Sequence, residues 1–102
     1  MKSDVANRLI WYKGKIVNVN DAMINVLAPT SQFGLNVFEG IPCYWNDDEK
    51  QLYAFRLEAH YDRLLRSARL IQINCPYTKS DMKNALVEVV KANEYDENLS
   101  VR

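Results

Sequence analysis

The sequence of 102 residues has few of the residues that define several classes of protein. It contains three glycines, three prolines, two cysteines and one histidine. So few glycines and prolines exclude a long flexible linker, and a lone histidine with two distant cysteines gives no metal-ligand spacing. No apolar run approaches the roughly 18 residues of a membrane span. The first eight residues, MKSDVANR, lack the apolar stretch of a signal peptide.

An excess of either charge is also lacking, since 13 lysines and arginines face 13 aspartates and glutamates. This balance argues against nucleic-acid binding and against attachment to a membrane surface, both of which use bulk positive charge. What is present is a globular composition, with 48% apolar and 11% aromatic residues. We therefore expect a cytoplasmic protein in which Cys43 and Cys75 are reduced thiols.

Short segments with strand-like composition fill the first half of the chain. Residues 9–12 and 16–19 flank a Lys-Gly-Lys turn and predict a hairpin. Residues 41–45 and 51–55 flank a charged turn and predict a second hairpin. Residues 23–27 are rich in side chains that favour strands, which predicts one more strand.

The second half changes to the period of a helix. Apolar side chains at helical spacing predict an amphipathic helix over residues 57–70. Thr78 and Asp81 have the spacing of a capping box, which predicts the start of a second helix that fades near Asn93. Residues 99–102 are typical of a strand.

Strands followed by helices favour an α+β fold, in which two amphipathic helices pack on one face of a mainly antiparallel sheet. We expect a polar tail over residues 1–8 and one domain over residues 9–102.

Few side chains carry obvious chemistry. The solitary His60 is typical of a polar residue on a helix surface or facing a sheet. An arginine cluster on the first predicted helix offers planar guanidinium groups that can bind an anion, but Glu58 and Asp62 lie between the arginines and favour a solvated face. The cluster consists of Arg56, Arg63, Arg66 and Arg69. No lysine has the surroundings of a Schiff-base nucleophile, so we expect no catalytic residue and no metal ligand.

The segment QFGLNVFEG, over residues 32–40, is unusual because two glycines bracket a short apolar and aromatic run. Glycine lets the backbone approach another group closely, which a binding site would use. The alternative is a helical turn that joins two strands and places Val37 and Phe38 in the core.

Several short motifs follow one another in a fixed order along the chain. They are IWYKGKIV at 10–17, FG at 33–34, VFEGI at 37–41, FRLEAHYDRLLRSA at 55–68 and VR at 101–102. In this order the sequence resembles the N-terminal small domain of the fold-type IV pyridoxal-phosphate enzymes, most closely the branched-chain amino-acid aminotransferases. The resemblance runs from about residue 10 to the last residue.

The resemblance implies roles for individual residues. The arginine of the His-x-x-Arg-Leu motif, Arg63 here, contacts the phosphate of pyridoxal 5′-phosphate in the family. Phe33, Phe38 and Gly40 match residues that line the substrate side-chain pocket. Arg102 matches an arginine near the substrate that can meet an acidic side chain. The implied reaction exchanges an amino group between a branched-chain amino acid and 2-oxoglutarate in a homodimer.

Three positions depart from the family pattern and keep alternatives open. Phe33 and Ser100 stand where tyrosine is common, and Pro42 replaces a residue that is often basic. A D-amino-acid aminotransferase or an aminodeoxychorismate lyase relative therefore remains an alternative. The family's catalytic lysine lies in a larger C-terminal domain, which we expect beyond residue 102, so we expect this chain alone to be inactive. Further alternatives are a short, non-catalytic relative that acts as a binding domain, and a small RNA- or anion-binding domain.

Overall fold

The computed structural model describes residues 5–102. The chain divides into two compact units, which we describe separately. One unit holds the chain up to Asn36 together with Asn84–Tyr95, and the other holds Val37–Lys83 with Asp96–Arg102. The division falls inside the helix α3 (Lys79–Asn93).

The first unit contains the predicted N-terminal hairpin. Strands β1 (Leu9–Tyr12) and β2 (Lys15–Asn18) pair antiparallel. Lys13 and Gly14 form the two-residue turn with φ of 52° and 89°, as a turn that follows the twist of a hairpin requires. The side chain of Asn93, in α3, bonds both the amide and the carbonyl of Leu9, at 2.9 and 2.8 Å. Short 3₁₀ turns η1 (Val5–Asn7) and η2 (Val19–Asp21) flank the hairpin.

Two predictions for this unit need comment. The polar tail over residues 1–8 falls in part on residues 1–4, which lie outside the described residues, and its remainder includes η1. The predicted strand over residues 23–27 is wrong, because Asn25 turns the chain locally. Its Oδ1 accepts from the Leu27 amide at 2.7 Å, and its carbonyl accepts from the Ala28 amide at 2.9 Å. The chain then enters the short helix α1 (Pro29–Phe33).

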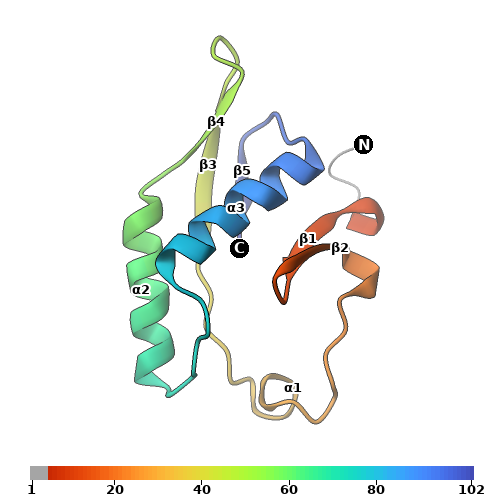
Figure 1. The fold of residues 1–102 in the computed structure, drawn as a ribbon, viewed down its shortest axis with the longest axis vertical. Helices are drawn as coiled ribbons and strands as arrows, with labels where there is room; N and C mark the ends of the chain where they lie inside the picture. Colours follow the sequence, from red (N-terminus) through yellow and green to blue (C-terminus); the bar gives the residue numbers. More distant parts are fainter. Residues whose placement is uncertain (1–4) are drawn as a thin grey trace. The chain divides into compact units, whose positions relative to one another are not determined.

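The second unit is built on a three-stranded antiparallel sheet (Figure 1). Strand β3 (Ile41–Asn46) lies between β4 (Gln51–Ala54) and β5 (Leu99–Val101). The predicted second hairpin and the final strand are both confirmed. The pair Ile41–Val101 joins positions far apart in the sequence, so the last strand borders the segment just before β3.

Helix α2 (Leu57–Leu70) has the predicted bounds. The predicted capping box at the start of α3 is also confirmed. Thr78 Oγ1 accepts from the Asp81 amide at 3.1 Å, and the Asp81 carboxylate accepts from the Thr78 amide at 2.8 Å. The first turns of α3 are tied to α2 by ion pairs from Lys79 and Lys83 to Glu58, at 3.1 and 2.6 Å.

Burial alternates along the segment that leads into β3. Glu39, Ile41 and Cys43 are buried, and Tyr61 of α2, also buried, lies beside Cys43. The residues between them face outward. This is the pattern of an antiparallel strand with one covered face. The α+β class is confirmed, with the strands in two antiparallel sheets.

Within residues 5–102, Cys43 and Cys75 are free thiols. No helix of this part of the chain is long and apolar enough to cross a membrane.

Candidate phosphate-binding site

The centre of the candidate site is a buried carboxylate. Glu39 lies two residues before β3 and shares the covered face with Ile41, so its side chain is only 7% exposed. A buried charge needs partners of opposite charge or hydrogen-bond donors. Both come from α2, where His60 and Arg63 lie three residues apart on one side of the helix.

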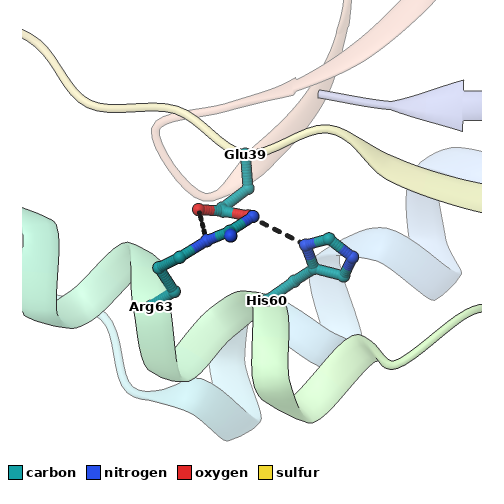
Figure 2. A network of polar contacts seen from close by, with 3 residues as sticks. All are labelled: Glu39, His60 and Arg63. Carbon is teal, nitrogen blue, oxygen red and sulfur yellow. Dashed lines mark hydrogen bonds and ion pairs between the residues drawn. The ribbon is translucent and has the colours of Figure 1, made fainter.

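Figure 2 shows the resulting network, in which Glu39 reaches from the strand side to the two helix residues. Arg63 Nε donates to Glu39 Oε2 at 2.8 Å, and Arg63 Nη2 donates to Oε1 at 2.6 Å. His60 Nδ1 lies 2.8 Å from the same Oε1. Because an ionised carboxylate only accepts, Nδ1 carries the hydrogen of this bond.

The network keeps Glu39 ionised. Hydrogen bonds from Arg63 first and His60 second lower the pKa of Glu39 from 4.5 to about 2, although burial acts in the opposite direction. The same bonds raise the pKa of Arg63. The carboxylate therefore presents a fixed negative charge to the guanidinium at any pH above its own titration.

Arg63 has one edge bonded and another available. A guanidinium group has five N–H donors, and Glu39 accepts from Nε and from one hydrogen of Nη2. Within residues 5–102 the two hydrogens of Nη1 and the second of Nη2 have no protein acceptor, and the side chain is 57% exposed. This outer edge matches the spacing of two phosphate oxygens. The residues present therefore fit the phosphate of pyridoxal 5′-phosphate.

The opposite side of the same segment holds the predicted substrate residues. The guanidinium carbon of Arg102 lies 4.9 Å from the centre of the Phe38 ring, within range of a cation–π interaction. Gly40 faces Ser100, whose Oγ lies 3.7 Å from where a Cβ on residue 40 would stand. Phe38, Gly40 and Arg102 thus come together at one end of the β3–β5 pair.

The remaining predicted substrate residue, Phe33, belongs to the other unit. It is the last residue of α1, and its side chain is 82% exposed. Gly34 follows with φ of 66°, a left-handed conformation that glycine adopts at little cost and that ends the helix.

Two interpretations from the sequence change. Phe38 does not enter the core, since it is 63% exposed, and the core position beside it belongs to Glu39. The acids between the arginines of α2 pair with lysines instead, because Glu58 and Asp62 both bond Lys79. His60 is the expected sheet-facing polar residue.

Sequence reasoning assigned no role to Glu39. A signal was available, because Glu39 precedes Ile41 and Cys43 at the two-residue period of a covered strand face. An acid in such a series predicts a basic partner. The partner could not be identified from spacing alone, since α2 is separate in sequence. Across the part of the chain that the structure describes, no group of histidine, cysteine, aspartate or glutamate residues could hold a metal ion.

Comparison with known proteins gives the same assignment by sequence and by structure. The profile of the amino-transferase class IV family matches residues 36–102. A probable branched-chain-amino-acid aminotransferase of Aquifex aeolicus is 34% identical over 92 residues, which make up 90% of this chain and 30% of the relative.

Two solved structures have the same fold. The branched-chain aminotransferase of Thermoproteus uzoniensis, solved with norvaline, matches 91% of this chain and 31% of its own at a TM-score of 0.86 and 43% identity. A second branched-chain enzyme, from an organism abbreviated T.th., is complexed with N-(5′-phosphopyridoxyl)-L-glutamate. It matches 88% of this chain and 30% of its own at a TM-score of 0.82 and 33% identity. The chain thus spans about 30% of the length of these relatives.

Proposed function

Because this chain belongs to the class IV aminotransferase family, we propose that it is the small-domain part of a pyridoxal-phosphate-dependent transaminase. In the whole enzyme the reaction exchanges an amino group between a branched-chain amino acid and 2-oxoglutarate. Residues 9–102 form the small domain, and the enzyme is a cytoplasmic homodimer. The chain by itself does not catalyse the reaction.

The observation that carries this proposal is the outer edge of Arg63. A relative with 33% identity is complexed with a phosphopyridoxyl compound, and Arg63 offers a forked pair of donors suited to such a phosphate. When bound, pyridoxal phosphate supplies an electron sink for negative charge on the substrate Cα. Arg63 holds the phosphate, and Glu39 and His60 hold Arg63.

Phe38, Gly40 and Arg102 form one wall of the substrate pocket, and Phe33 contributes to the same pocket. Phe38 gives an apolar surface for a branched side chain, and the missing side chain at Gly40 leaves room beside it. Arg102, held over the Phe38 ring, provides a positive charge for the side-chain carboxylate of glutamate. One relative is solved with norvaline and another with a glutamate adduct, so both kinds of side chain occur in the family.

The test compares the protein encoded by the whole gene with residues 1–102 alone. We expect the whole product to transfer the amino group of leucine, isoleucine or valine to 2-oxoglutarate, measured as glutamate formed, and to lose most of this activity in Arg63→Ala. We expect no turnover by residues 1–102.

Two outcomes would contradict the proposal. Transfer from D-alanine without transfer from the branched-chain amino acids would assign the enzyme to the D-amino-acid group. Turnover by residues 1–102 alone would contradict the absence of catalysis in this part. Arg66→Ala, on the same helix, is the matched control for loss of one positive charge.

A further inference from the structure

We propose that Glu39 is a positioning residue that fixes the Arg63 guanidinium so that its outer edge faces a phosphate group. This role, which rests on the proposed phosphate contact of Arg63, gives the buried acid of the Phe-Glu-Gly motif a function of its own. It makes phosphate recognition depend on a residue that does not touch the phosphate.

The geometry imposes this order on an otherwise mobile side chain. Arginine has a long, flexible stem, and more than half of Arg63 is exposed, so burial alone does not fix it. The two parallel bonds at 2.8 and 2.6 Å fix both the plane and the rotation of the guanidinium.

Glu39 is itself held in place from two directions. Its backbone leads directly into β3 through Gly40, and its Oε1 also bonds His60 at 2.8 Å. Constraints therefore run from the sheet and from α2 to the carboxylate, and from the carboxylate to the outer edge of Arg63. The phosphate meets donors that are already oriented.

Electrostatics alone would argue against an acid at this place. A carboxylate that touches the phosphate-binding arginine also repels the phosphate dianion. A site that relied only on charge would bind phosphate more tightly after Glu39→Gln. A site that relies on orientation would bind it less tightly, because glutamine presents one acceptor where two are needed and turns a donor toward other donors. The two explanations predict opposite signs.

The experiment titrates the full chain with pyridoxamine 5′-phosphate and, separately, with pyridoxamine. The side-chain Nε–H resonance of Arg63 reports both binding and orientation by NMR. We expect the unchanged chain to prefer the phosphorylated ligand. In Glu39→Gln we expect this preference to fall by roughly tenfold, as for the loss of a preorganised arginine fork. Before any ligand is added, the Arg63 resonance of the variant should move toward that of a solvent-exposed arginine.

Two further variants keep the test decisive. Glu58→Gln also removes one negative charge from α2, but from a carboxylate that bonds Lys79 and Lys83, so the preference should stay unchanged. His60→Ala removes one of the two supports of Glu39, and we expect a smaller fall of about threefold. Circular dichroism checks the folding of each, and His60→Ala carries the test if Glu39→Gln does not fold.

The outcomes separate this inference from the proposed function. An unchanged chain with no phosphate preference and no movement of the Arg63 resonance would contradict the phosphate contact itself. A preference that is lost in Arg63→Ala but kept or strengthened in folded Glu39→Gln and His60→Ala would overturn the positioning role and leave the contact intact. A fall in Glu39→Gln, with Glu58→Gln unchanged, supports both.

Discussion

The segment that leads into β3 has two faces with different chemistry. The covered face holds an acid and small or apolar side chains, whereas the outer face holds aromatic rings, a glycine and a proline. The covered face consists of Glu39, Ile41 and Cys43, and the outer face of Phe38, Gly40, Pro42 and Tyr44. Neighbouring residues in one short motif therefore serve two different surfaces.

Each face holds one arginine, and the two are held by different forces. Arg63 is fixed by a bidentate bond to Glu39, which sets its orientation. Arg102 lies 4.9 Å from the centre of the Phe38 ring, a contact that sets its distance but leaves it free to turn. The comparison teaches that the covered face fixes direction, which suits a group of constant shape, and the outer face permits adjustment to side chains that differ.

The largest difference between the faces should appear in their contributions to folding. Ile41→Ala removes a fully buried side chain, and we expect it to lower the free energy of unfolding by about 3 kcal/mol. Tyr44→Ala, on the outer face of the same strand, loses its edge contact with Phe55 and should cost about 1 kcal/mol. Urea unfolding followed by circular dichroism measures both. Equal losses would mean that both faces are covered.

Glu39→Gln should give the next largest effect and a characteristic dependence on pH. At neutral pH we expect a loss of about 2 kcal/mol, moderate for an ion pair because Arg63 is more than half exposed. The pKa of Glu39 is lowered from 4.5 to about 2, so its contribution is complete above 4.5 and disappears as the pH falls toward 2.

The measurement is the free energy of unfolding of both proteins across this acid range. The unchanged chain and Glu39→Gln should differ most near neutral pH and converge at the acid end. A difference that stays constant with pH would show that the ionised carboxylate is not the source of the stability.

On the outer face, Phe38→Leu tests the contact with Arg102. Leucine keeps an apolar side chain but removes the ring face, so we expect a loss of about 0.5 kcal/mol at this exposed site. The same substitution in an Arg102→Ala background should cost less, and a double-mutant cycle gives the coupling. Full additivity would mean that the two side chains do not interact in solution.

Gly40→Ala should have the smallest effect. A Cβ there would lie 3.7 Å from Ser100 Oγ, an ordinary contact distance, and we expect a change of less than about 0.5 kcal/mol. Gly34→Ala is the informative control, because its φ of 66° should make that substitution cost about 1 kcal/mol. Thermal unfolding compares them, and a large loss at Gly40 would reveal a covered outer face.

Most of the fold follows from signals within a few residues. The Lys13–Gly14 turn, the apolar spacing of α2 and the Thr78–Asp81 cap each act locally, and all three are confirmed. The strand predicted over residues 23–27 is wrong because composition favoured a strand, whereas the Asn25 side chain satisfied the backbone in a turn.

The candidate site was less accessible to sequence reasoning. The roles of Arg63, Phe38, Gly40 and Arg102 came from resemblance, and they remain proposals. The partner of Arg63 depends on a tertiary contact, because Glu39 and Arg63 are 24 residues apart and belong to different elements. A period of two could reveal that Glu39 is covered, but no local pattern could reveal which base meets it.

The pairing of β5 with β3 also has a consequence for synthesis of the chain. Val101 lies opposite Ile41, 60 residues earlier (101 minus 41). At about 5–20 residues per second, the ribosome makes β3 roughly 3–12 seconds before its second neighbour. During that interval β3 can pair with β4 on one side only, and its other edge presents unpaired amides and carbonyls. The nascent chain is therefore most exposed to mispairing with other chains just before its last strand emerges.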